Sequence, residues 1–326
     1  MALVYNVRAG ASSVAREFSP RAGKEELPMG YRGRHKARSR FHFLFVILCC
    51  LALLMLAYPF LEPFLLETES VTLTSADLPA DVGQLKIVYV SDIHQGAYFS
   101  QGRVRSLVTR INSLNPDIIL LGGDYANPSE EAIAFFQSAP SFHARYLTAA
   151  VVGNHDRTAP ENNLEALQQA MYDAGIVPLV NSVNRLKIGT DYIYLAGIDD
   201  VDNGWPDLEG VAAQVDRNDY VIFLSHSPAI LGKALDARDR DGDKGWFDLA
   251  LCGHTHGGQV TLLGQPILES ARTSGRYWRG WYEANRAYML VSNGVGTSGL
   301  PIRLFAQPQI HLITIPVSYT HLRANE

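Results

Sequence analysis

The stretch from residue 86 to residue 94, KIVYVSDIH, decides how this chain folds. Its first five residues, Lys86–Val90, form a short apolar run that is typical of a buried strand. Asp92 and His94 follow directly, and their side chains are of the kind that ligates transition metals. Because open α/β sheets place ligand sites outside the carboxyl ends of their strands, this order predicts an α/β protein with a metal site.

Four more segments repeat the arrangement of an apolar run followed by Asp, Asn or His. The runs are Asp117–Leu121, Thr148–Val152, Tyr220–Leu224 and Phe247–Leu251. The polar segments after them are Gly123-Asp124, Gly153-Asn154-His155-Asp156, Ser225-His226 and Gly253-His254-Thr255-His256. A single Gly-Asp or Ser-His pair is usually an ordinary turn. Five such segments at strand ends, three of them with a glycine that permits close backbone approach, are instead expected to converge on one site.

The rest of the chain after residue 84 alternates between strand and helix patterns. A further apolar run, Tyr192–Ala196, reads as a strand. Helical patterns lie at Val104–Leu114, Glu130–Gln137 and Leu164–Ala174. This alternation predicts a sheet with a substantial parallel component. Later runs have no long helix between them, so we expect them to form a second, more antiparallel sheet. They are Gln259–Leu263, Ala287–Val291 and Ile310–Ile315.

The nineteen residues Phe43–Leu61 carry no charge, which is close to the ~20 that a helix needs to cross a bilayer. Basic residues precede this run, and they predict a cytoplasmic amino-terminal side with the chain after Leu61 on the other side. They are Arg32, Arg34, Lys36, Arg38 and Arg40. A buried soluble helix and a cleaved signal peptide are the alternatives. The run is long for a signal peptide and no small-x-small cleavage site follows, so we expect an uncleaved, single-pass anchor in the cytoplasmic (inner) membrane.

The charge is unevenly distributed along the chain. Residues 1–40 hold nine Lys or Arg and three Glu, a charge of +6, so the total of −5 leaves −11 for the remainder. So acidic a body matches a nucleic-acid backbone poorly, so we expect no nucleic-acid partner. Separately, we expect a monomer. Cys49 and Cys50 lie in the apolar run and Cys252 in a core strand, which gives no disulfide framework.

The ordered set D-x-H, G-D, G-N-H-D, H and G-H-x-H resembles the motifs of the calcineurin-like metallophosphoesterases. It is most similar to their membrane-associated bacterial phosphodiesterase branch, whose last motif reads G-H-T-H-G-G-Q, as in Gly253–Gln259. The resemblance covers about residues 85–316. It implies a four-layer α-β-β-α sandwich, with two mixed sheets flanked by helices, preceded by one transmembrane helix. Together with the charge and hydropathy pattern, the expected domains are a basic cytoplasmic head (1–40), a transmembrane anchor (41–62), a linker (63–84), a metallophosphoesterase domain (85–317) and a disordered tail (318–326).

The resemblance also implies two adjacent divalent metal ions, and donors without thiolate suit Mn, Fe or Zn. The first ion would be held by Asp92, His94 and His256. The second would be held by Asn154, His226 and His254. Asp124 would bridge the two. His155 would act as the general acid toward the leaving oxygen, and Asp156 would orient its imidazole. A metal-bridging hydroxide would attack phosphorus.

We therefore expect a membrane-anchored phosphoesterase with two metals that cleaves phosphodiester or phosphomonoester bonds. Its substrate would be a small molecule or a lipid-linked phosphoester, and its domain would lie on the extracytoplasmic side. One alternative is a UDP-diacylglucosamine-type pyrophosphate hydrolase of lipid A synthesis, which needs a cytoplasmic site. Others are a non-catalytic metal-binding scaffold and a nuclease, which the acidic body disfavours.

Three weaker candidates lie outside the motifs. Asp199 and Asp200 could line the site, although a solvated turn is the interpretation we favour. The aromatic cluster Tyr277–Tyr282 fits substrate stacking, lipid contact or simple packing equally well. Arg303 is a candidate phosphate ligand.

Overall fold

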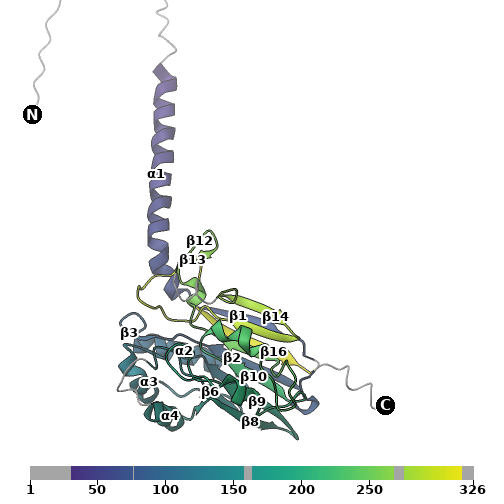
Figure 1. Ribbon diagram of the computed structural model, residues 1–326. Helices are drawn as coiled ribbons and strands as arrows, with labels where there is room; N and C mark the ends of the chain where they lie inside the picture. The colour runs from purple at the N-terminus through teal and green to yellow at the C-terminus, as the bar shows by residue number, and fades with distance from the viewer. Residues whose placement is uncertain (1–30, 76, 158–163, 268–274, 318–326) are drawn as a thin grey trace, which may run out of the picture. The chain divides into compact units, whose positions relative to one another are not determined.

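The computed structural model describes residues 31–75, 77–157, 164–267 and 275–317. Two six-stranded sheets form the body of the protein (Figure 1). Strands β2, β4 and β6 of the first sheet are parallel, and β16 runs antiparallel to β2. In spatial order, this sheet contains β1 (Glu67–Thr72), β16 (Gln309–Pro316), β2 (Gln84–Val90), β4 (Ile118–Leu121), β6 (Leu147–Ala150) and β7 (Val177–Pro178).

The second sheet has a parallel centre and antiparallel edges. Its central strands are β15 (Ala287–Val291), β11 (Leu249–Cys252), β10 (Tyr220–Leu224) and β9 (Asp191–Gly197), all parallel to one another. The edge strands β14 (Gly280–Ala284) and β8 (Ser182–Ile188) pair antiparallel with β15 and β9. Two small ladders join β3 (Gln95–Gly96) to β5 (Ala126–Asn127) and β12 (Thr261–Leu262) to β13 (Gln265–Pro266).

The prediction that the late strands form a separate, more antiparallel sheet is wrong. β15 joins the parallel centre of the second sheet beside β11. β16 belongs to the first sheet, where Ile313 and Ile315 enter the core between the sheets. An apolar run shows that a strand is buried but not which distant strand it pairs with, because the same alternation of side chains suits either sheet.

Side chains of β2 show how the layers are built. Ile87 and Tyr89 point into the core between the two sheets, whereas Val88 and Val90 point to the opposite face. That outer face is covered by α2 (Gln101–Ser113), α3 (Ala132–Ser138) and α4 (Leu164–Asp173). The outer face of the second sheet is covered by α5 (Leu208–Ala212) and α6 (Leu231–Ala234). The expected arrangement of mixed sheets flanked by helices is confirmed. Single 3₁₀ turns complete the fold at η1 (Glu62–Phe64), η2 (Ala80–Val82), η3 (Ser129–Glu131), η4 (Pro228–Ile230) and η5 (His256–Gly258).

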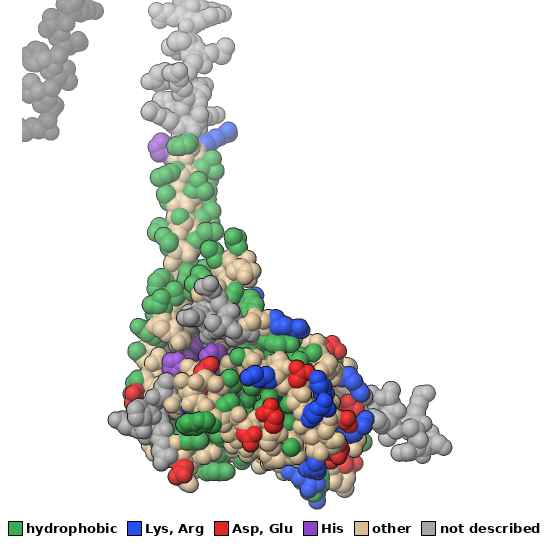
Figure 2. All heavy atoms as spheres, in the orientation of Figure 1, with side chains coloured by type: hydrophobic (Ala, Val, Ile, Leu, Met, Phe, Trp, Pro, Cys, Tyr) green, Lys and Arg blue, Asp and Glu red, His purple; other side chains and the backbone are tan. Residues whose placement is uncertain are grey.

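Helix α1 (Tyr31–Leu61) precedes the sheets and is longer than the predicted anchor. Within the described part of the chain, the segment Arg40–Phe64 is the helix that is long and apolar enough to cross a membrane. Figure 2 shows hydrophobic side chains along its exposed surface. Residues 1–30 and 318–326, which include most of the predicted head and all of the predicted tail, lie outside the described residues.

The predicted linker, residues 63–84, is instead partly a structural element of the domain. Its strand β1 pairs in parallel with β16 over its whole length. Just before it, Glu62 is buried, and its carboxylate accepts the backbone N–H groups of Phe305 (2.9 Å) and Ala306 (2.6 Å). β1 is half-exposed at the edge of the sheet, so its sequence lacks the apolar alternation that identifies a buried strand.

Candidate metal centre

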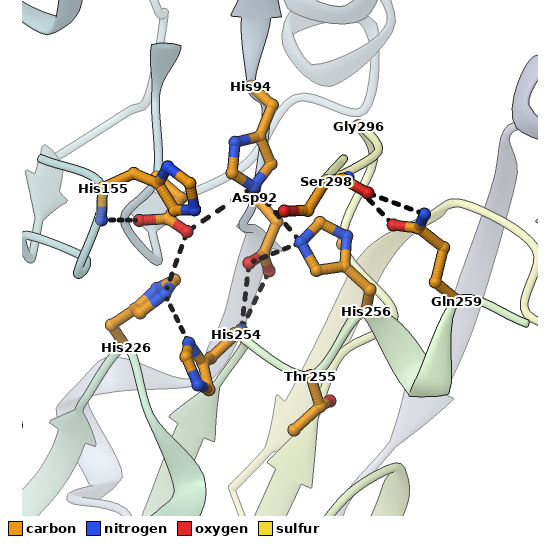
Figure 3. Close-up of polar contacts among 12 residues, drawn as sticks. Asp92, His94, His155, His226, His254, Thr255, His256, Gln259, Gly296 and Ser298 are labelled. Carbon is orange, nitrogen blue, oxygen red and sulfur yellow. Dashed lines mark hydrogen bonds and ion pairs between the residues drawn. The ribbon is translucent and has the colours of Figure 1, made fainter. Parts of the chain in front are cut away.

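The two sheets bring all seven predicted metal ligands to one place, at the carboxyl ends of their strands. The first sheet supplies Asp92, His94, Asp124 and Asn154 from the segments after β2, β4 and β6. The second supplies His226, His254 and His256 from the segments after β10 and β11. Figure 3 shows Asp92 and the histidine rings turned toward one another, with ribbons from both sheets around them.

The first group of donor atoms surrounds His94. Its Nε2 lies 3.2 Å from Nε2 of His256 and 3.5 Å from Oδ2 of Asp124. Asp92 completes the group, with Oδ1 3.6 Å from His256 Nε2. Donor atoms that share one ion at ~2.1 Å lie roughly 3.0–3.5 Å apart, so these side chains fit around a single metal ion.

The second group surrounds Asn154. Its Oδ1 lies 3.1 Å from Nε2 of His226 and 3.0 Å from Nδ1 of His254. His226 Nε2 also lies 3.3 Å from Oδ2 of Asp124, the same oxygen that faces the first group. Asp124 therefore occupies the position between the two groups that a bridging carboxylate requires.

Hydrogen bonds set the tautomer of His226 for ligation. Its Nδ1 lies 2.7 Å from the carbonyl oxygen of Gly122. Because a carbonyl oxygen can only accept a hydrogen bond, Nδ1 carries the proton and donates it. Nε2 then directs a lone pair at the oxygens of Asp124 and Asn154, and lone pairs that face one another need a cation or a proton between them. Accordingly the pKa of His226 is raised: burial lowers it, but the negative charges of Asp124 and neighbouring carboxylates outweigh burial.

Burial keeps other ring nitrogens available as ligands. It lowers the pKa of His94 and of His254 to about 4, so both rings are neutral at pH 7, the form that binds metal. Asp124 is buried as well, yet His226 and His94 hold its pKa well below the usual value despite burial. The neutral rings of His94 and His254, together with the ionised carboxylate of Asp124, are suitable donors for a divalent ion.

The backbone at the site is strained. Five of the seven predicted ligands have positive φ angles, a region that is costly for residues other than glycine. They are Asp92 (55°), His94 (46°), Asp124 (57°), His254 (70°) and His256 (51°). The glycines beside them allow this path, because a Cβ at Gly153 would clash with Asp124 and one at Gly253 would clash with Asp92.

Removing metal is expected to destabilise the protein, because the strain and the facing lone pairs then lack a compensating cation. Mn²⁺ at ~100-fold above its dissociation constant would add about 2.7 kcal/mol, or roughly 5–10 °C in melting temperature. Differential scanning fluorimetry before and after chelation measures this shift. The variant H226A/H254A serves as the control and should respond less. An identical melting temperature with and without metal would contradict the assignment.

His155 lies at the edge of the first group. Its half-buried ring packs edge-on against the ring of His94, with centroids 4.9 Å apart, and its backbone N–H donates to Asp124 Oδ1 (2.9 Å). Asp156 is buried and accepts the backbone N–H groups of Gly153 (2.8 Å), Asp124 (2.8 Å) and Tyr125 (3.0 Å). Asp156 therefore joins two motif segments, and its action on the His155 ring stays a prediction.

The turn at Asp199 and Asp200 is buried, so the solvated turn that we favoured is wrong. Asp199 forms an ion pair with Arg157, with Oδ1 3.1 Å from Nε. Asp200 accepts the backbone N–H of Asn203 (2.6 Å), whose side chain in turn donates to the carbonyl oxygen of Asn154 (3.0 Å). The turn thus supports the backbone of a predicted metal ligand.

Sequence reasoning missed Asp202. Its Oδ2 lies 3.5 Å from Nε2 of His254, on the side of the ring opposite the nitrogen that faces Asn154. A carboxylate at this position fixes the tautomer of a metal-binding histidine and raises its basicity. Asp202 lies several residues after the end of β9 and belongs to no motif, so no sequence pattern identifies it.

We expect Asp202→Asn to weaken metal binding about tenfold. Loss of a carboxylate that contacts a metal-binding histidine typically lowers metal affinity by about 10- to 100-fold, and we expect the lower end because Asp202 is half-exposed. Titration of the metal-free protein with Mn²⁺, followed by calorimetry, measures the change. Asp241→Asn replaces an exposed carboxylate on another loop and is the matched control. Equal affinities for both variants and wild type would show that Asp202 does not act on the site.

Arg303 and the buried part of the aromatic cluster have structural roles. Arg303 is fully buried and donates to the carbonyl oxygens of Gly296 (3.0 Å), Asn293 (2.8 Å) and Ala306 (2.6 Å), so its proposed role as a phosphate ligand is wrong. In the aromatic cluster, Tyr277 is buried and the Tyr282 hydroxyl accepts the backbone N–H of Trp278 (3.2 Å).

Comparisons with known proteins agree with this geometry. Residues 85–258 match the family described as calcineurin-like phosphoesterase. The chain is 30% identical over 274 residues to an uncharacterized metallophosphoesterase of Aquifex aeolicus, covering 81% of this chain and 97% of that protein. It is 27% identical to phosphodiesterase YaeI of Escherichia coli, covering 71% and 82%. It is 30% identical to a bovine transmembrane protein with metallophosphoesterase domain, covering 72% and 53%.

The chain thus has residues positioned to hold metal ions, and its relatives are named as metallophosphoesterases. The match to the family covers the segment from β2 to η5, which carries every predicted ligand. The chain belongs to the calcineurin-like phosphoesterase family.

Proposed function

We propose that this protein is a membrane-anchored phosphodiesterase whose active site binds two divalent metal ions. The observation that carries the proposal is the position of Asp124, whose Oδ2 faces His94 at 3.5 Å and His226 at 3.3 Å. One carboxylate oxygen thus points into two separate groups of donors. The name of the E. coli relative supports a diester substrate.

Each group of side chains would hold one ion. Asp92, His94 and His256 would bind the first, and Asn154, His226 and His254 the second, with Asp124 between them. Such ions, which would be Mn, Fe or Zn, lower the pKa of bound water and offset the charge of phosphoryl oxygens. His155 extends from the same loop as Asn154 and is only half-buried, so its ring can reach a substrate. We assign it the proton transfer to the leaving oxygen.

The proposal is tested with the full-length protein in detergent. With Mn²⁺ it is expected to hydrolyse bis-p-nitrophenyl phosphate with a higher kcat/KM than p-nitrophenyl phosphate. A preference for the monoester would overturn the assignment as a phosphodiesterase. Stoichiometric metal binding without turnover of either compound would favour the non-catalytic scaffold.

We further propose that α1 anchors the domain in the cytoplasmic membrane with the site on the extracytoplasmic side. The apolar segment Arg40–Phe64 and the transmembrane relatives support the anchor. The basic residues between Arg32 and Arg40 support the orientation. An alkaline-phosphatase reporter fused after residue 85 should be active, because this enzyme matures outside the cytoplasm. An inactive fusion would indicate the opposite topology, with the site in the cytoplasm. It would favour the lipid-linked pyrophosphate hydrolase, whose site faces the cytoplasm.

A further inference from the structure

An apolar patch surrounds the loop that follows the last metal-binding motif. Five large hydrophobic side chains of this patch are more than half exposed, and Leu263 at the tip of the β12–β13 hairpin is 95% exposed. They are Leu262, Leu263, Ile267, Leu300 and Phe305, and we call them the apolar platform. Soluble surfaces rarely gather such side chains without a partner.

Hydrogen bonds hold the segments that carry the platform together. Val260 and Leu304 form a β-bridge, and Thr261 N–H donates to the carbonyl oxygen of Leu304 (3.0 Å). Ile267 N–H donates to the carbonyl of Val260 (3.0 Å), which closes the hairpin. The Gln259 side chain donates to the carbonyl of Leu300 (3.1 Å). The hairpin and the segment from Leu300 to Phe305 are therefore held together.

The platform is also attached to the last turn of α1. Arg303 N–H donates to the carbonyl oxygen of Pro59 (2.9 Å), and the ring of Phe305 lies 6.5 Å from that of Tyr58. The buried carboxylate of Glu62 accepts the N–H of Phe305 (2.9 Å). Figure 1 shows β12 and β13 beside this end of the helix. The apolar platform thus begins where the proposed anchor ends.

We propose that the apolar platform inserts into the surface of the bilayer that α1 spans, so that the metal centre works on phosphoesters presented by that membrane. The inference rests on the proposed anchoring. A segment bonded to the last turn of a membrane helix lies at the level of the headgroups, and exposed Leu, Ile and Phe bury ~5–10 Å into that region. Arg279, exposed and bonded through its side chain to the Phe305 carbonyl (2.8 Å), adds a cation at the rim for anionic headgroups.

The platform is joined to the site through the loop that carries the last predicted ligand. His256 and Gln259 belong to one short loop, and the side chain of Gln259 also accepts the N–H of Ser298 (2.9 Å). The preceding residue, Thr297, lines a cavity of about 240 Å³ together with His94. A phosphoester with an acyl chain in the bilayer would reach the metal-binding side chains without leaving the membrane surface. The substrate class that fits is a phosphodiester headgroup on a lipid.

Fluorescence quenching in vesicles tests the insertion without requiring turnover. The full chain, with Cys49 and Cys50 replaced by Ala and the buried Cys252 retained, receives one new cysteine labelled with an environment-sensitive dye. Leu263→Cys reports on the platform, Leu54→Cys on the anchor and Lys187→Cys, exposed on the edge strand β8, on the aqueous surface. The vesicles contain phosphatidylethanolamine and phosphatidylglycerol, with nitroxide-labelled lipid as the membrane quencher and iodide as the aqueous one.

We expect the label at residue 263 to be quenched several-fold more by nitroxide lipid than the label at residue 187, and to be protected from iodide. Quenching of residue 263 by iodide alone, with residue 54 quenched by lipid, would overturn the docking and leave the anchor and the enzyme intact. A label at residue 263 that is not quenched by nitroxide lipid, but is better protected from iodide at higher protein density, would also overturn the docking. That result would favour contact between copies of the protein. A lipid-quenched residue 263 in an inactive protein would sustain the docking and overturn the proposed activity.

Discussion

Replacing Asp124 by Asn is expected to lower kcat on bis-p-nitrophenyl phosphate by about 100- to 1,000-fold, the cost of removing a central electrostatic group. The amide keeps an oxygen that can accept the N–H of His155, so the local backbone should persist. It loses the negative charge that faces both donor groups through one oxygen. Steady-state kinetics with Mn²⁺ measures the loss, and inductively coupled plasma mass spectrometry measures bound metal.

The matched control for this variant is Asp241→Asn, which removes an exposed carboxylate. It should retain the kcat and the metal content of the wild type. Circular dichroism of both variants establishes that the fold is kept. Full activity of Asp124→Asn would rule out a shared carboxylate as the basis of catalysis.

His155→Gln is expected to produce a loss that depends on the leaving group. For a diester with a poor, alkyl leaving group, loss of a general acid should lower kcat by about 100- to 10,000-fold. For a p-nitrophenyl diester the loss should be far smaller, because p-nitrophenolate departs without protonation. The measurement is the slope of log kcat against leaving-group pKa, which should be steeper for the variant.

Metal content distinguishes this role from ligation. A nitrogen of His155 lies near the donor atoms of His94 and Asp124, so its position would also permit it to bind metal. Unchanged metal stoichiometry in His155→Gln supports proton transfer, whereas loss of one ion would make His155 a ligand. His143→Gln, at an exposed histidine, is the control for the substitution itself.

Periodicity and motif placement predicted the parts of this fold that depend on local sequence. Lys86–Val90 and Tyr220–Leu224 read as buried strands because successive side chains must be apolar when both faces of a strand are covered, as they are from Ile87 to Val90 and throughout Tyr220–Leu224. Both runs lie inside observed strands. The site followed from them, since strand ends define where the polar segments meet.

Long-range pairing was the part that the sequence did not reveal. β1 reads as a linker because its partner, β16, lies more than two hundred residues away and only that pairing makes it a strand. Asp202 and the turn at Asp199 act through contacts formed only after the sheets have packed. Such residues carry no periodic or motif signal of their own.

The division of ligands between the sheets has a mechanical consequence. A metal ion held by Asp92 and His256, or by Asn154 and His226, would tie one sheet to the other at their shared edge. It would act as a cross-link in a domain whose cysteine, Cys252, is a free thiol, and it would not depend on disulfide formation. Small separations of the sheets would pull the donors apart before the apolar layer opens. In a denaturant titration, activity should then vanish ahead of the fold, so that catalysis reports how tightly the two halves are closed.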